Sequence, residues 1–249
     1  MKTACEAKNS SRTRTLAHET RKNRQWLSML AIAALAVSAV ITSCNKDDEG
    51  VGGSITRITA RVENANDFVN VTTVRLLGWN TVTRKFDALA EADFRNNGFA
   101  LNLPETVAEE YLENVDDTEI YTTLTDFDFF KLPGIKISNN NAKLLTNVEI
   151  NGYNSAGVRI TFFHNYLENE GANSYTNSFT GYWYVDSDVN ISASQKETYD
   201  EYEETRNISL VLKKGWNVVY YSQNIRFKER KMKNEITSTP VKGLKWEAW

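Results

Sequence analysis

The sequence predicts an all-β fold, an antiparallel β-sandwich of roughly ten short strands. Three observations predict it. Short segments rich in β-branched and aromatic residues alternate between apolar and polar positions, and turn residues separate them at the spacing typical of sandwiches. Only one short helix is expected. A closed β-barrel with similar strand lengths is the alternative, because such patterns do not reveal whether a sheet closes.

The first half of the chain contains four candidate strands. Residues 86–94 also suit a short helix because they contain alanine and glutamate. They precede Arg95-Asn96-Asn97-Gly98, which predicts a hairpin turn in which Asn-Gly supplies positive φ. The four expected strands are 55–62, 72–79, 86–94 and 99–103.

A single short helix is expected at residues 105–113. Pro104 precedes a segment of helix-forming composition, and proline is favoured at the start of a helix.

The second half predicts further hairpins and strands. Asn154-Ser155-Ala156-Gly157 separates strands expected at 146–153 and 158–166. Polar residues predict a surface loop at 168–178 and a long, acidic hairpin loop at 195–205. The remaining expected segments are a long strand or bent pair at 179–194 and strands at 206–212, 216–222, 224–230 and 243–249.

Residues 27–49 have the pattern of an export segment. Arg21, Lys22 and Arg24 precede an apolar run that is short for a membrane-spanning helix and ends at Cys44. We therefore expect a signal peptide that is removed, and the lipobox resemblance described below implies that it comprises residues 1–43. The glycine-containing residues 44–53 would be a flexible tether, and 54–249 the β-sandwich domain.

Small residues directly before Cys44 resemble the lipobox of bacterial lipoproteins. This resemblance implies that Cys44 becomes an acylated first residue anchored in a membrane. Lys46-Asp47-Asp48-Glu49 resembles the signal after the cysteine in surface lipoproteins of the Bacteroidetes, which implies transport to the outer face of the outer membrane. The alternative is a solvated linker on a protein that faces the periplasm.

Parts of the domain resemble known sandwiches. Residues 55–62, 74–79 and 97–104 look like the opening strands of transthyretin-like or carboxypeptidase-regulatory-like domains, although 63–71 lack the usual glycine and proline. Residues 212–217 and 244–246 look like uncharacterised lipoproteins of the same bacterial group. These resemblances imply an immunoglobulin- or transthyretin-like sandwich and no particular activity.

Composition excludes several classes of function. After removal of 1–43 the chain would hold 22 basic and 30 acidic residues, a formal charge of −8 that argues against nucleic acid as a partner. The only cysteines are Cys5 and Cys44, so the domain has no thiol for catalysis or metal binding. His164 is its only histidine, expected at the margin of the core, and the sequence predicts no metal and no cofactor.

Paired and clustered charges receive structural interpretations. Asp126 with Asp128, and Asp186 with Asp188, could bind Ca²⁺ or form the carboxylate pair of a glycosidase, but exposure on a strand or turn is the expectation. The acidic side chains of residues 195–205 are expected to keep a loop soluble. Basic residues at 226, 228 and 230 are expected to protect a strand edge.

Aromatic residues are the remaining candidates for a binding site. Trp216, Trp246, Tyr182 and Tyr184 are the residues on which a glycan-stacking platform is predicted, with packing in the core as the alternative.

The sequence therefore predicts a non-enzymatic, lipid-anchored cell-surface protein that binds a glycan or an envelope protein. One alternative is a surface glycoside hydrolase that uses two carboxylates, and another is a structural subunit of a surface fibre or envelope complex.

Overall fold

A computed structural model describes residues 53–117, 131–199 and 201–249. Three sets of residues discussed above lie outside the described residues. They are the expected signal peptide, the Cys44–Glu49 segment and the pair Asp126 and Asp128.

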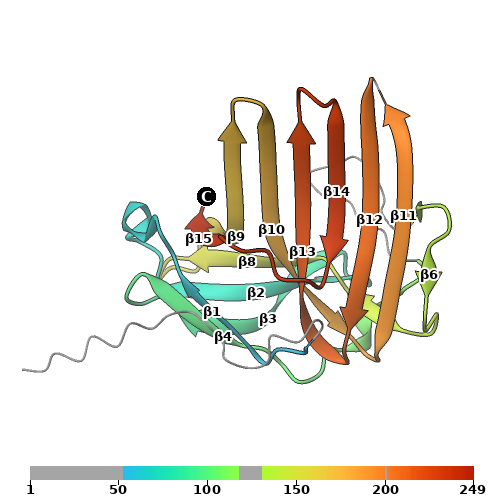
Figure 1. The fold of residues 1–249 in the computed structure, drawn as a ribbon. Helices are drawn as coiled ribbons and strands as arrows, with labels where there is room; N and C mark the ends of the chain where they lie inside the picture. Colours follow the sequence, from blue (N-terminus) through green and yellow to red (C-terminus); the bar gives the residue numbers. More distant parts are fainter. Residues whose placement is uncertain (1–52, 118–130, 200) are drawn as a thin grey trace, which may run out of the picture. The chain divides into compact units, whose positions relative to one another are not determined.

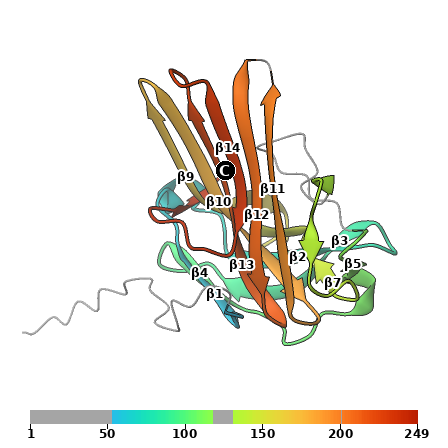
Figure 2. The same cartoon turned by 45° about the vertical axis from the view of Figure 1, so that its right-hand side comes forward.

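The described chain is all-β, with two short 3₁₀ turns, η1 (Ala65–Phe68) and η2 (Glu109–Tyr111) (Figures 1 and 2). The strands are β1 (Arg57–Arg61), β2 (Thr73–Asn80), β3 (Lys85–Asp93), β4 (Gly98–Asn102), β5 (Glu113–Asn114), β6 (Lys136–Ile137), β7 (Lys143–Leu145), β8 (Val148–Tyr153), β9 (Arg159–Gly171), β10 (Ser174–Val185), β11 (Val189–Tyr199), β12 (Tyr202–Leu212), β13 (Gly215–Arg226), β14 (Lys231–Thr237) and β15 (Lys245–Ala248).

The strands form a sandwich rather than a barrel. The main sheet has the order β3-β2-β8-β9-β10-β13-β14-β12-β11-β6, and its two ends do not meet among the described strands. Pairing is antiparallel except between β12 and β14. β1 and β4 form a separate two-stranded sheet beside β2 and β3 (Figure 1).

Two hydrophobic cores fill the sandwich. The first core lies between the β1–β4 sheet and strands β2, β8 and β9, and includes Leu76, Leu101 and Trp216. The second core lies between the five strands β10, β11, β12, β13 and β14 and the chain around β7. It includes Trp183, Leu144 and Ile191. Side chains fully buried in this way supply most of the free energy that favours folding.

Strand β10 contributes to both cores because its side chains alternate between the two faces of the sheet. Trp183 is fully buried in the second core, whereas its neighbour Tyr184 is 3% exposed in the first. On the paired strand β13, Trp216 is likewise buried in the first core and Val219 in the second. This part of the sheet is therefore a wall shared by the two cores.

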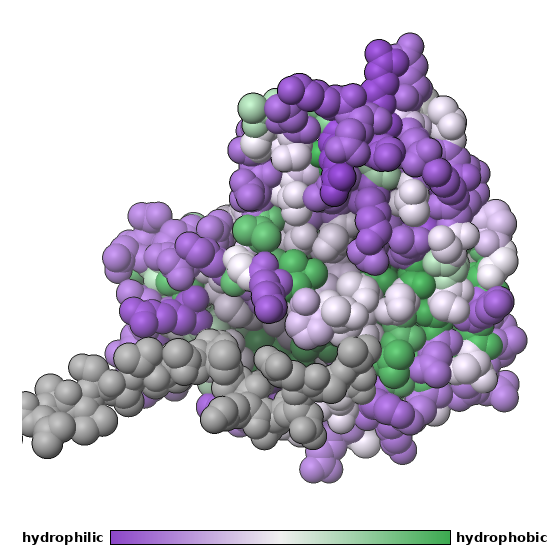
Figure 3. Space-filling view, in the orientation of Figure 1, coloured by the Kyte–Doolittle hydropathy of each residue, from purple (hydrophilic) through white to green (hydrophobic). Residues whose placement is uncertain are grey.

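The expected loop at 168–178 is wrong, because these residues complete the β9–β10 hairpin. β9 continues to Gly171 and β10 begins at Ser174, and residues 171 and 174 face each other in the register. Figure 3 shows mainly hydrophilic residues at the tips of the long hairpins. Because both strand faces are wet there, the segment has no apolar alternation, and backbone pairing alone makes it a strand.

Two further expectations are also wrong. Most of the acidic loop expected at 195–205 is the paired end of β11 and β12, closed by a turn between Tyr199 and Tyr202. The strand expected at 224–230 is the end of β13 at Arg226 followed by the turn to β14.

The helix expected at 105–113 is also wrong. Only the three residues of η2 form a helical turn, and Glu113 already pairs with Leu144 of β7. Val107 and Leu112 pack against the first core, so tertiary contacts override a weak helix propensity. The ambiguous segment 86–94 is a strand, since β3 pairs with β2 along its length.

The turn before β4 differs from the expected use of Asn-Gly. Asn96 and Asn97 take positive φ, at 53° and 61°. Gly98 does not, but a Cβ there would lie 2.2 Å from the carbonyl oxygen of Ala60. Glycine is therefore needed for the close approach of β1 to β4.

Within the three described ranges, no helix combines the length and apolar character that crossing a membrane requires.

We expect Trp216→Ala to lower the free energy of unfolding by about 3–5 kcal/mol, because it empties a space in the first core and removes a hydrogen bond to the Pro104 carbonyl. Urea unfolding measures this loss. Trp249→Ala is the matched control, since Trp249 is 54% exposed. Equal effects of the two substitutions would contradict the assignment of Trp216 to the core.

Candidate functional site

The four aromatic residues predicted to bind glycan do not form a surface platform. Trp216, Tyr184 and Trp246 are 2%, 3% and 8% exposed. The indole of Trp216 donates a hydrogen bond of 2.9 Å to the Pro104 carbonyl. Tyr182 stacks on Trp246 with 6.3 Å between the ring centroids, and burial raises its pKa. The rings of this set therefore pack in or against the first core.

Asp186 and Asp188 stabilise the turn between β10 and β11 instead of facing a common ligand. Asp186 accepts a hydrogen bond of 2.9 Å from the Lys143 backbone amide. Asp188 accepts hydrogen bonds from the Lys214 amide and the Lys213 ammonium, each 2.9 Å, which lower its pKa. The two carboxylates thus bind different segments of the chain.

Charged residues of the long hairpins also pair with one another. The buried Glu204 carboxylate accepts two hydrogen bonds from Arg206 and one from Asn234, which explains how an acid lies 3% exposed. Arg226 and Arg230 lie at the tip of β13–β14, where they pair with Glu229 and Glu201. These contacts are structural. In the described part of the chain, no group of three or more acidic, histidine or cysteine side chains could hold a metal ion.

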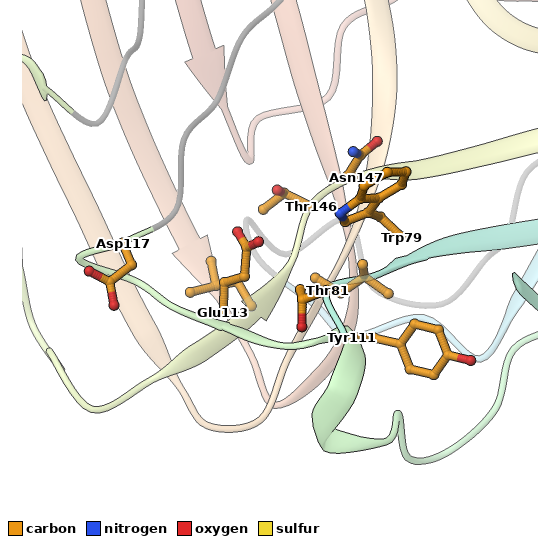
Figure 4. A pocket seen from close by; sticks show the side chains of 9 residues that line it. Trp79, Thr81, Tyr111, Glu113, Asp117, Thr146 and Asn147 are labelled. Carbon is orange, nitrogen blue, oxygen red and sulfur yellow. The ribbon is translucent and has the colours of Figure 1, made fainter. Parts of the chain in front are cut away.

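A pocket of about 300 Å³ lies where the end of β2 meets the β7–β8 connection (Figure 4). Two leucines and seven polar or aromatic residues line it. The leucines are Leu144 and Leu145, and the other seven residues are Trp79, Thr81, Tyr111, Glu113, Asp117, Thr146 and Asn147.

Trp79 is held at this pocket by both its backbone and its ring. It lies near the end of β2, where its amide donates a 3.1 Å hydrogen bond to the Asn147 carbonyl. Phe86, opposite it on β3, contacts the indole edge-on with 5.2 Å between the ring centroids. The indole is half-buried. A ring fixed in this way, with part of its surface open, needs little further ordering to bind a ligand.

The turn after β2 is organised by Asn80, which is 5% exposed. Its side-chain oxygen accepts hydrogen bonds of 3.0 Å from the amides of Val82 and Thr83. Its amide nitrogen donates to Asp87, which also accepts a hydrogen bond from the Tyr111 hydroxyl. Burial, followed by the Asp87 charge, raises the pKa of Tyr111, so the phenol stays protonated. This network fixes Thr81 and Tyr111 at the pocket.

Two carboxylates lie at the pocket from a second segment. Glu113 belongs to β5 and Asp117 to the turn that follows it, where the Asp117 amide donates to the Asn114 carbonyl. In Figure 4 the Glu113 carboxylate points towards Thr146, Asp117 lies at the far end, and the Tyr111 hydroxyl points away. Two carboxylates, one amide and two threonine hydroxyls thus line the same pocket as the Trp79 indole.

This arrangement has the chemistry that binds sugars. An indole presents an apolar face to the C–H groups of a sugar ring. Carboxylates accept hydrogen bonds from sugar hydroxyls, and the Asn147 amide can both donate and accept. The pocket therefore combines stacking with several hydrogen-bonding groups around it.

The sequence contains part of the signal for this pocket. Trp79 is one of the six tryptophans of the chain, but nothing in its local sequence marks it as a partly exposed ring at a pocket. Glu113 falls in a segment of helix-forming composition, and its place beside Trp79 depends on the pairing of β5 with β7.

Comparison with protein-family models, with curated proteins and with solved structures found no match to this chain.

We expect Asn80→Ala to lower the free energy of unfolding by about 1–3 kcal/mol, because buried hydrogen-bonding groups lose their partner. The change is read from urea unfolding. Asn169→Ala, at an exposed position of β9, is the control and should change stability little. A loss as small as that of the control would show that Asn80 does not organise the turn.

Proposed function

We propose that this chain is a lipid-anchored cell-surface protein that binds carbohydrate in the pocket beside Trp79, without catalysing a reaction. The observation that carries the proposal is the half-buried Trp79 indole, fixed by Phe86 and bordered by Glu113, Asn147 and Thr146. A fixed aromatic surface with hydrogen-bonding groups at its edge provides both stacking and orientation.

The proposed anchor is Cys44. Its lipobox-like context and the acidic signal Lys46-Asp47-Asp48-Glu49 support attachment to the outer membrane with the domain outside the cell. A periplasmic orientation is the alternative. In either orientation, residues 44–53 would link the lipid to the folded domain. The domain begins near Ile55, whose amide donates a 2.7 Å hydrogen bond to the Trp216 carbonyl.

The second candidate function is glycoside hydrolysis. It is favoured by one observation, the presence of the carboxylates of Glu113 and Asp117 in the same pocket. A hydrolase of this class uses two carboxylates, one as a general acid and one as a nucleophile or base. Release of reducing ends from a bound polysaccharide would favour this function over simple binding.

Binding is tested by retention of the protein on a panel of insoluble polysaccharides. We expect the chain to be retained on at least one of them, and Trp79→Ala to weaken retention by about tenfold or more because stacking is lost. Glu113→Gln should weaken it with little change in folding. Trp249→Ala is the matched aromatic control. Retention that is absent, or equal for all variants, would contradict the proposal.

The anchor is tested by fractionation and by protease treatment of intact cells. We expect the wild-type chain to be membrane-bound and removed by external protease. Cys44→Ser should release it from the membrane fraction, because no other residue would carry lipid. Replacing Lys46-Asp47-Asp48-Glu49 with serines should keep it membrane-bound but protected from protease. An unchanged distribution of both variants would contradict the proposed anchor and signal.

A further inference from the structure

Along one edge, strand β9 pairs first with β8 and then with β10. A second cavity lies where the first pairing ends and the second begins. On that edge, β8 pairs up to Asn151 opposite Phe162, and β10 pairs from Phe179 opposite Tyr166. β15 occupies the other edge. Between the two partners, residues 163–165 pair with neither, because β8 crosses the lower layer while β10 rises beside β9 (Figure 1). A cavity of about 490 Å³ lies at this fork.

Two buried polar groups that line this cavity, the Asn151 side-chain oxygen and the Thr180 hydroxyl, have no hydrogen-bond partner in the described structure, and of the two only the Asn151 oxygen is restricted to accepting. Asn151 lines the cavity and is 1% exposed, and no group in the described structure donates to its side-chain oxygen. Its amide nitrogen donates a 2.9 Å hydrogen bond to the Glu149 carboxylate. Because a carboxylate only accepts, this contact fixes which end of the amide is the oxygen. A buried acceptor without a donor is costly, so a bound group that donates would stabilise it.

The rest of the cavity wall is largely aromatic. Tyr182 and Trp246 stack on one side, and Phe179 stacks on Tyr221 with 4.6 Å between the ring centroids. Phe162 lies near the entrance, 41% exposed. Gly181 leaves room for this packing, since a Cβ there would lie 2.8 Å from the Tyr221 ring. Aromatic rings of this kind favour an apolar ligand and attract cations to their faces.

The charged and titratable groups that line the cavity are Glu149, His164 and Arg159, together with Tyr182 and Tyr221, whose pKa burial raises. Glu149 is half-buried beside Asn151. His164, expected at the margin of the core, is exposed and contacts Phe162 edge-on, and desolvation, opposed by Glu149, lowers its pKa. Arg159 is exposed at the rim, where solvent screens its charge. The Asn151 side-chain oxygen can therefore accept a hydrogen bond beside the negatively charged carboxylate of Glu149.

We propose that the cavity at the β8–β9–β10 fork binds a small protonated amine that carries an apolar ring. The ammonium donates hydrogen bonds to the Asn151 side-chain oxygen and to the Glu149 carboxylate. The ring lies among Tyr182, Trp246 and Phe179. The volume is in the range of small-molecule sites. The cavity shares Thr146 with the Trp79 pocket, but Asn151, Glu149 and the rings assigned here do not line that pocket, so the proposal does not rest on carbohydrate binding.

The direct test is isothermal titration of the full chain with phenethylamine, 2-phenylethanol and 3-phenylpropanoate. The three probes share a ring and differ in charge. We expect saturable binding of phenethylamine, with 2-phenylethanol weaker by about tenfold because an ionised donor makes the stronger hydrogen bond. 3-Phenylpropanoate should not bind. Equal binding of the three probes, or no heat from phenethylamine up to about 10 mM, would overturn the proposal.

Two substitutions test the assigned residues, and one controls for them. Glu149→Gln removes the charge and Asn151→Leu removes the acceptor, and each should weaken phenethylamine binding by about tenfold. Glu170→Gln changes an exposed carboxylate higher on β9 and should leave affinity unchanged. Thermal unfolding of each variant, with and without phenethylamine, separates loss of binding from loss of folding. Undiminished binding by a folded Glu149→Gln or Asn151→Leu variant would also overturn the proposal.

Discussion

The rest of the structure depends on the burial of both faces of β10 and β13. Trp183 and Tyr184 are adjacent in sequence, yet each is almost fully buried, in different cores. A shift of one residue in the register would exchange these two large rings and disrupt both cores at once. The register of β10 against β13 is therefore strongly determined, and it fixes the strands that pair outward from them.

This shared wall also explains where the two pockets lie. Strand β9 pairs with β8 on the lower layer and with β10 on the wall, so one edge must divide between them, and the cavity at Asn151 occupies the division. The β7–β8 connection begins beside β10, because β7 pairs with Tyr184 and Val185. It continues past Trp79 as part of the first pocket. The fork itself is a direct consequence of using one strand in two layers.

Local sequence was sufficient where a strand has one wet and one buried face. Ile58 and Ala60 alternate with exposed neighbours in β1, and the pattern predicts that strand closely. It was insufficient for the ends of β9–β10 and β11–β12, where polar residues occupy both faces and backbone pairing defines the strand. The helix expected at 105–113 failed because pairing of Glu113 with Leu144 is a contact between distant segments.

The candidate sites were less predictable than the fold, for a related reason. Alternation shows that Trp183 and Tyr184 face opposite ways, but not that a second layer covers both faces. Trp216 is covered by Ile55 and Pro104, which only the three-dimensional arrangement brings to it. The unpartnered oxygen of Asn151 has no signal in sequence, since it depends on the absence of a donor from three different strands.

Native-state hydrogen exchange tests the shared wall most directly. If β10 and β13 join the two cores, the slowest amides of β2 in the first core and of β12 in the second should exchange with the same opening free energy as those of β10. Amides near the hairpin tips should open more easily. Separate opening free energies for β2 and β12, with β10 following only one of them, would contradict the account.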